Sequence, residues 1–432
     1  MFRTYANAFK IPELRKKLLI TALILILYRI GACLPVPFVN AEVFRAYMNN
    51  EGGTIFSFFN FLSGSSFSQS TLFALGVSPY ITSSIVVQLL AVAFPKLAGV
   101  GEEGKKRMQA LTRYITVGVS LLTAIGYYMI LKNSKALMEG FTGFFYAVII
   151  VACYCAGSSL VMWLGEKINE FGIGNGISLI LFANIVSSVP SLIGYMISMI
   201  VAKPLEGSLF TAGVCILMSS LIWLVIYISD SERRIPVQYA KKVVGRKMYG
   251  GHNTNLPIKL NMTGVMPIIF ANSIISIPST INMFWKPMAG TFWYRVFNAF
   301  TVNSWVYAVL SLILIIAFAY FYTAISFNPV EVASNMQKNG GSIPGVRPGK
   351  ATVDFITKVL NRITLIGALY LAVIAVVPIV IQLIINIFTN DYSIAAFAFG
   401  GSSIIIVVGV ILETAREIEA QMTMRHYKGF LD

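Results

Sequence analysis

Apolar stretches separated by short polar segments run along almost the whole chain. Each holds roughly 20 residues, the length that an α-helix needs to cross a bilayer. The first begins at Leu18, after Arg15-Lys16-Lys17, and is long enough to span, so we interpret it as an uncleaved helix and not a signal peptide. The pattern predicts ten spans, at about residues 18–36, 72–94, 111–131, 144–164, 176–201, 209–229, 263–284, 304–325, 364–387 and 396–413.

The apolar region Thr54–Leu90 is interrupted by a stretch rich in serine and glycine, residues 63–68. Unpaired backbone amides in hydrocarbon cost several kcal/mol each, so a lipid-facing helix cannot be broken in this way. Irregular backbone at membrane depth is tolerated where it is buried in protein or lines a water-filled cavity. We therefore predict a half-inserted plug at about 54–70, in front of the second span and facing a central cavity. Its candidate residues are Phe56, Phe59, Asn60 and Gly64.

Composition and charge support a membrane protein. The chain is 56% hydrophobic and 12% charged, whereas soluble domains have about 25% charged residues. Its net charge is +15, and alternate loops carry about 26 Lys and Arg residues on the side of the N-terminus against about 6 on the other, with Arg29 inside the first span. By the positive-inside rule, both termini are cytoplasmic and the odd-numbered spans run outward.

Two long cytoplasmic loops, at about 230–262 and 326–363, hold basic residues well away from the helix ends. Topology alone needs only a few charges beside each span, so we predict a docking surface for an acidic partner. Ribosomal RNA, an acidic protein and anionic lipid all fit that charge, and ordinary solvated loops are the alternative. Short stretches within the loops, Gln238–Val244 and Val353–Leu360, are predicted to form strand or helix.

Ten spans divide into two groups of five, residues 1–205 and 206–432. An odd number of spans in each half forces the halves into opposite orientations, which is the inverted-repeat plan of many transport proteins. The broken second span then corresponds to the seventh, Thr263–Phe284, which is interrupted by Pro267 and Pro278. The plan places the functional site between the halves.

The sequence offers no motif for catalysis, a metal or a cofactor. Gly99–Lys106 fits most of a phosphate-binding loop but lacks the final Ser or Thr and a preceding strand. The glycines Gly172, Gly174 and Gly176 favour a sharp turn or a close helix approach instead of an anion site. Neither His252 nor His426 has Cys, Asp or Glu at ligand spacing.

Polar residues inside the spans are nearly all uncharged, whereas ion-coupled carriers keep ionisable groups there. Each alone is explained by a bond between helices, but together they favour a pore that binds no ion. A secondary solute transporter with the same inverted plan remains the alternative, and a membrane scaffold with basic docking loops is a third class. The polar residues are Thr82, Ser83, Ser84, Gln88, Asn175, Asn184, Asn272 and Gln382.

Six motifs then follow one another along the chain: FALGVSPYITSSIVVQLL, WLGEKINEFGIGNGISLILFANIV, LPIKLNMTGVMPIIFANSI, FNPVEVASNMQKNGGSIPGVRPGKAT, RITLIGALYLAV and IEAQMTMRHYKGFL. Together they resemble the bacterial SecY family, the channel subunit of the protein-export translocon. The resemblance implies an all-α polytopic membrane protein with two inverted five-helix halves around an hourglass pore. It also implies a plug, and a lateral gate between spans two and seven. Unfolded polypeptides pass through such a channel or leave it sideways into lipid, and the chain itself performs no bond chemistry.

Matching positions give candidate residues. An aliphatic constriction excludes ions by dewetting yet yields around an extended polypeptide. Val77 and Leu181 replace the isoleucine that is commoner in the family, and Ser65 stands where it often has a glycine. The implied pore ring is Val77, Ile81, Ile177, Leu181, Ile269 and Ile406; the predicted gate is Thr82, Gln88 and Ile277; and the predicted motor or ribosome contacts are Arg246, Lys247, Arg347 and Lys350.

The resemblance also implies partners. These are the small membrane subunits SecE and SecG, the ATPase SecA, ribosomes with their RNA, signal peptides and nascent chains, and membrane lipids. The implied location is the bacterial plasma membrane, crossed many times. No cofactor is expected.

Overall fold

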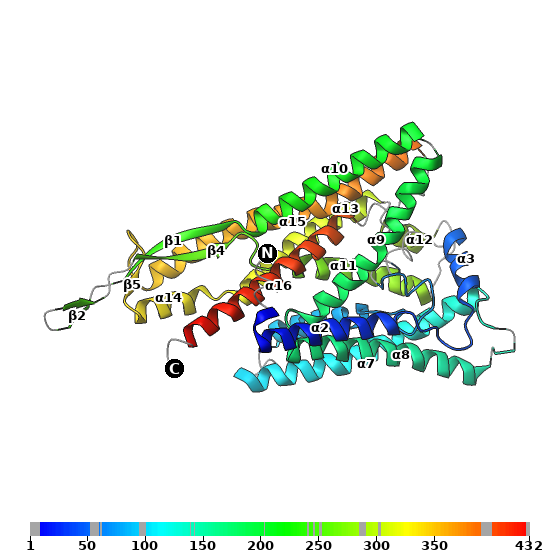
Figure 1. The fold of residues 1–432 in the computed structure, drawn as a ribbon, viewed down its shortest axis with the longest axis horizontal. Coiled ribbons are helices and arrows are strands. Elements are labelled where there is room, and N and C mark those ends of the chain that lie inside the picture. Colours follow the sequence, from blue (N-terminus) through cyan, green and yellow to red (C-terminus); the bar gives the residue numbers. More distant parts are fainter. Residues whose placement is uncertain are drawn as a thin grey trace.

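A bundle of long helices makes up most of the computed structural model (Figure 1). It describes residues 9–51, 60, 63–94, 101–138, 140–141, 143–202, 204–239, 242–244, 247–249, 253–284, 291–300, 304–389 and 400–428. The long helices are α2 (Pro12–Gly31), α5 (Ser78–Ala93), α7 (Gly101–Asn133), α8 (Phe144–Phe171), α9 (Gly176–Ala202), α10 (Pro204–Ser229), α11 (Met266–Phe284), α13 (Trp305–Ser326), α15 (Lys350–Thr389) and α16 (Gly400–Lys428).

Each predicted span falls on one of these helices. Within the described ranges, six helices are long and apolar enough by themselves to cross a membrane, namely α7, α8, α9, α10, α13 and α15. Helix α5 and the apolar part of α11 are shorter, while α2 carries charged residues near its start and α16 near its end. The predicted all-α membrane fold is confirmed, and the number of spans stays a prediction.

The helices form two groups joined by α9 (Figure 1). Helices α5, α7 and α8 pack on one another, and α2 packs on α8. On the other side α13 packs on α15, and α16 contacts both α10 and α15. We call α2 to α9 the N-terminal group and α10 to α16 the C-terminal group. The boundary near residue 205 and the inverted relation of the groups remain predictions.

The two long basic loops form one packed unit, which extends beyond the helix ends (Figure 1). Strands β1 (Glu232–Tyr239), β4 (Asn253–Lys259) and β5 (Gly341–Ser342) form an antiparallel sheet in the order β4-β1-β5, so one loop pairs with the other. Helix α14 (Pro329–Lys338) and the start of α15 cover it. The Asn328 side chain caps α14 by accepting bonds from two of its amides. The buried core is Ile235, Val237, Ile258, Ala333, Met336, Ile343, Ile356, Leu360 and Ile363.

Of the two short stretches predicted to form strand or helix, one forms strands and the other is helical. Gln238–Val244 covers the end of β1 and the strand β2 (Lys242–Val244), which pairs with β3 (Lys247–Tyr249). Val353–Leu360 is helical, because α15 begins at Lys350, well before the predicted span. Two short helices, α3 (Ala41–Glu51) and α12 (Phe292–Ala299), lie away from this unit (Figure 1).

The start of α2 lies beside the end of α16. Leu14, Ile173 and Ile418 form a small buried cluster there. The Lys17 ammonium donates to the side chain of Gln421 over 3.2 Å. The two terminal helices therefore meet at the same end of the bundle.

The predicted sharp turn after α8 is confirmed. Gly174 has a left-handed φ of +87°, which glycine adopts without strain. A Cβ on Gly176 would lie 2.0 Å from the carbonyl oxygen of Gly165, so the helices approach too closely for any side chain there. The Gly174 amide donates to Glu417 of α16 over 2.9 Å, which ties this turn to the C-terminal group.

We predict that Ile258→Ala loosens the basic unit. Ile258 is completely buried in the core that joins the two loops, and truncating a buried aliphatic side chain costs about 2–5 kcal/mol. Hydrogen exchange at the amides of β1 and β4 should accelerate accordingly. Val330→Ala, at an exposed position on α14 of the same unit, is the matched control and should leave exchange unchanged. Equal effects of the two changes would contradict this packing.

Candidate functional site

The six predicted ring residues are all buried. They come from α5, α9, α11 and α16, with Val77 just before α5, and all belong to one apolar cluster that spans both helix groups. Val77, Ile81, Leu181, Ile269 and Ile406 pack within this cluster. Ile177 packs against α8, because its Cδ1 atom lies 2.5 Å from where a Cβ on Gly165 would be. Their action as a ring remains a prediction.

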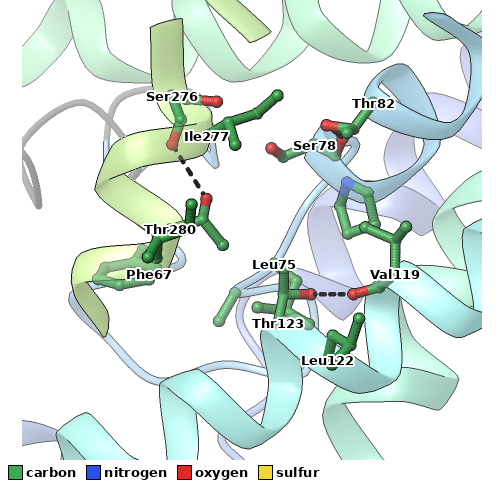
Figure 2. Close-up of a pocket in the computed structure, with 13 residues that line it drawn as sticks. Phe67, Leu75, Ser78, Thr82, Val119, Leu122, Thr123, Ser276, Ile277 and Thr280 are labelled. Atoms are coloured by element: carbon green, nitrogen blue, oxygen red, sulfur yellow. Dashed lines mark hydrogen bonds between the residues drawn. The ribbon is translucent and has the colours of Figure 1, made fainter. Parts of the chain in front are cut away.

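A cavity of about 300 Å³ lies between α5, α7 and α11 (Figure 2). Two predicted gate residues, Thr82 of α5 and Ile277 of α11, both line it. Phe67 and Leu75, from the segment before α5, and Leu122 of α7 close other sides. The lining is almost wholly apolar, so the structure brings these gate positions together around an apolar gap.

Five hydroxyls in or near this gap bond within their own helices. Thr82 and Ser83 donate to carbonyls one turn earlier in α5. Ser273, Ser276 and Thr280 do the same in α11. Moving α5 away from α11 therefore breaks none of these bonds.

The third predicted gate residue, Gln88, lies elsewhere. It lines a larger, more polar cavity of about 770 Å³ between α5, α7 and α8, with the ion pair Arg113–Glu166 beside it. Its amide donates to Ser84 over 3.2 Å. The Tyr322 side chain of α13 lies near Gln88. This proximity brings the N-terminal group next to the C-terminal group.

The plug prediction is described only in part, because Phe56 and Phe59 lie outside the described residues. Asn60 accepts bonds from three serines of the segment: its carbonyl from the Ser65 amide and the Ser63 hydroxyl, and its side chain from the Ser68 amide. Gly64 has a φ of +62°, and a Cβ there would lie 2.8 Å from the Ser187 hydroxyl of α9. The plug segment therefore packs against α9, nearly two turns beyond Leu181.

Two of the four predicted docking residues are exposed on the basic unit, and the side chains of the other two are not described. Arg347 and Lys350 are exposed, and the Thr352 hydroxyl fixes the turn between them by donating to the Arg347 carbonyl over 2.9 Å. Arg246 lies outside the described residues, and Lys247 is in β3 with its side chain not described. Burial lowers the pKa of Lys259 on β4, and the neighbouring positive charge of Arg416 lowers it further.

No group of three or more His, Cys, Asp or Glu side chains that could hold a metal occurs among the described residues.

Known proteins resemble this chain over its full length. The family model for SecY matches residues 71–415. The protein translocase subunit SecY of Streptomyces coelicolor is 40% identical over 445 residues, and that of Mycobacterium tuberculosis is 40% identical over 457, with 100% of both chains covered in each case. This chain belongs to the SecY family.

Solved structures support the fold. A structure described as that of a protein conducting channel has a TM-score of 0.67, is 17% identical, and the match covers 94% of this chain and 92% of that one. Sec61 in the canine ribosome-channel complex gives a TM-score of 0.64 with the same identity and coverage. The SecY-family fold therefore holds for helices α2 to α16 despite the low identity.

Sequence reasoning missed the tyrosines that hold the plug of this SecY-family chain. The Tyr28 hydroxyl donates to Asn184 over 2.8 Å beside the plug, and Tyr127 and Tyr154 bond to the plug itself. A signal was available, because a tyrosine within an apolar span needs a partner for its hydroxyl. The sequence did not indicate which partner.

We predict that Tyr322→Phe makes the resting channel easier to open. The change removes the hydroxyl near Gln88 and keeps the ring packed on Phe270. If the closed channel uses a polar interaction between these side chains, its loss is worth about 1 kcal/mol, so ion leak across planar bilayers should rise about fivefold. Tyr320→Phe is the control, since its hydroxyl bonds to Asn361 within the C-terminal group. An equal leak in both variants would mean that the Tyr322 hydroxyl does not hold the gate.

Proposed function

We propose that this SecY-family chain forms the channel through which unfolded secretory polypeptides cross the plasma membrane of a bacterium, and that it releases transmembrane segments sideways into the bilayer. One observation carries the lateral route: Thr82 and Ile277 line a single apolar cavity between α5 and α11, next to Phe67 of the plug. The relatives named protein translocase subunits support the transport of proteins. As such a subunit, the chain conducts its substrate and is not itself an enzyme.

The buried aliphatic cluster is the proposed seal that keeps ions from crossing the resting channel. Val77, Ile81, Leu181, Ile269 and Ile406 offer no polar atom to a hydrated ion, so a narrow passage among them stays dry. An extended polypeptide replaces the lost contacts with its own side chains, whatever its sequence. The plug, pressed against α9 through Gly64, covers the outer side of this constriction.

The lateral gate follows from the bonding pattern of α5 and α11. Their hydroxyls bond within each helix, and Ile277 is 42% exposed at the outer edge of the gap. Separation therefore exposes mainly apolar surface, which lipid tails or an apolar signal segment can cover. Gln88 and Tyr322, which lie near each other across the two helix groups, separate when the gate opens.

In this proposal, partner proteins supply the energy for transport and bring the substrate to the channel. The basic unit, with Arg347 and Lys350 exposed, is the proposed contact for the ATPase SecA and for ribosomes. The canine relative was solved in a ribosome-channel complex, which supports the ribosome as a partner. SecE and SecG are proposed as the small membrane subunits. The proximity of the start of α2 to the end of α16 supports placing both termini on one side, proposed as cytoplasmic.

Replacing Ile81 and Ile406 by Gly, or deleting residues 55–68, should make the resting channel conduct ions. Gly removes the aliphatic side chains, so the constriction becomes wide enough to hydrate. Conductance of planar bilayers measures this directly. The matched control is Val86→Gly with Ile411→Gly, exposed positions on the same two helices. A solute transporter would instead move a small solute down an ion gradient and show no such conductance. If the parent protein fails to transport a labelled preprotein, the proposed function is rejected.

Arg347→Glu should reduce SecA-driven export about tenfold or more, because a like charge then faces an acidic partner. Folding should be unaffected, since the side chain is exposed. Transport of a labelled preprotein into vesicles measures the export. Lys338→Glu makes the same change of charge at another exposed position of the unit and should have a smaller effect. Loss of folded protein in the Arg347 variant would show a structural role instead.

A further inference from the structure

The chain turns sharply between α8 and α9, and the start of α9 leaves backbone amides that the helix itself does not pair. Two of these amides find partners within the N-terminal group. The Ile173 amide donates to the Thr21 hydroxyl of α2 over 3.1 Å. The Gly176 amide donates to the Asn169 side chain of α8 over 2.7 Å. The Gly174 amide, by contrast, has its partner in the C-terminal group.

The partner of this amide is the Glu417 carboxylate of α16. Its Oε2 atom accepts from the Gly174 amide over 2.9 Å, and its Oε1 atom accepts from the Gln421 side chain over 3.2 Å. The Gln421 oxygen in turn accepts from the Lys17 ammonium of α2 over 3.2 Å. Both carboxylate oxygens are therefore engaged, and the bond to Gly174 is charge-assisted, which makes it stronger than a bond between neutral groups.

Helix α16 is also tied to the C-terminal group at this level. Neighbouring residues on a helix point about 100° apart, so Arg416 and Glu417 reach different elements. The Arg416 Nη2 atom donates to the Ser229 carbonyl and to the Asp230 carboxylate, both over 2.6 Å, at the end of α10. The Glu417 carboxylate is therefore held out toward the turn from a helix that is itself fixed.

Apolar packing closes the rest of this contact. Ile173 and Ile418 are almost completely buried, in one cluster with Leu14 of α2. Gly174 has a φ of +87°, which suits glycine, and a Cβ there would lie 3.1 Å from the Thr414 hydroxyl of α16. The turn therefore fits closely between α2 and α16, whereas the gate helices α5 and α11 have a cavity of about 300 Å³ between them.

This contact lies close along the chain to residues of the proposed seal. Gly174 is three residues before Ile177 of α9, and Leu181 follows one turn later. On α16, Ile406 lies about three turns before Glu417. A shift of the start of α9 relative to α16 therefore moves Ile177 and Leu181 relative to Ile406. An apolar passage that is widened by such a shift takes up water and conducts ions.

We propose that Glu417 is a positioning residue for the seal: its carboxylate holds the start of α9 against α16, so that the aliphatic side chains of the two helices stay opposed in the resting channel. The proposal rests on the function proposed above. Glu417 acts through the position of α9 and not through contact with the transported chain. It is also the point at which a bond between side chain and backbone joins the two helix groups.

Glu417→Ala should raise the ion leak of the resting channel across planar bilayers about tenfold, because it removes a charge-assisted bond between the groups. Glu417→Gln keeps an oxygen that accepts from the Gly174 amide, so its leak should stay within about threefold of the parent. The matched control is Asp354→Ala, which removes a carboxylate from an exposed position on α15 and should leave the leak unchanged. Equal leak in the alanine and glutamine variants of Glu417 would overturn the proposal.

A distance measurement separates positioning from a general loss of packing. With the native cysteines replaced, spin labels are attached at Glu170→Cys and Thr423→Cys, exposed positions near the ends of α8 and α16. Double electron–electron resonance should give a longer or broader distance distribution for Glu417→Ala. The parent distribution is expected for Glu417→Gln and for Asp354→Ala. A leaking Glu417→Ala with an unchanged distribution would show that Glu417 does not position α9, and would overturn the proposal.

Two further comparisons keep the test decisive. If Glu417→Ala gives no folded protein, Glu417→Asp takes its place: it keeps the charge but is one methylene group too short for the Gly174 amide. Parent leak and parent distances in Glu417→Asp would overturn the proposal. The distance measurement does not require transport, so a parent that moves no labelled preprotein would reject the channel function and leave the predicted change in distance intact.

Discussion

The structure depends on one constraint, that every backbone polar group at membrane depth must find a partner inside the protein. Helices satisfy it by themselves. Residues 63–77 do not, and amides and carbonyls of this segment are paired instead within the segment, by the linker after α2, and by the hydroxyls of Tyr127 and Tyr154. An irregular plug can exist there because three neighbouring elements supply those partners.

The same constraint explains how much of the fold could be predicted. Bilayer thickness sets the length of an apolar run, so every predicted span coincides with a helix. The break at residues 63–68 was equally visible, because serine and glycine are poor candidates for a lipid-facing helix. Boundaries outside the membrane follow other rules. The early start of α15 was missed because Ile356 and Leu360 are buried by the basic unit and not by lipid.

Pairings between distant segments could not be predicted from one sequence. Nothing in residues 230–262 indicates that β1 pairs with Gly341 and Ser342, since the bonds are made by backbone that any sequence carries. The partners of Tyr127 and Tyr154 were hidden for a similar reason, because both hydroxyls bond to main-chain carbonyls of the plug. Thr82 and Ile277, by contrast, were placed through the family resemblance and do line one cavity.

The position of hydroxyl bonds separates the parts that can move from those that cannot. In the gate, Thr82, Ser273 and Thr280 bond to carbonyls of their own helices, so the surfaces of α5 and α11 part without leaving polar groups bare. At Phe67 and Ser70, by contrast, the hydroxyls of Tyr127 and Tyr154 bond across elements, and breaking such buried bonds costs the full desolvation of each group. At the gate, Gln88 likewise donates to Ser84 of its own helix, and Tyr322 of the other group lies near it. Polar side chains that meet across the gate while keeping partners in their own helices can be replaced by an arriving segment without leaving a buried donor unpaired.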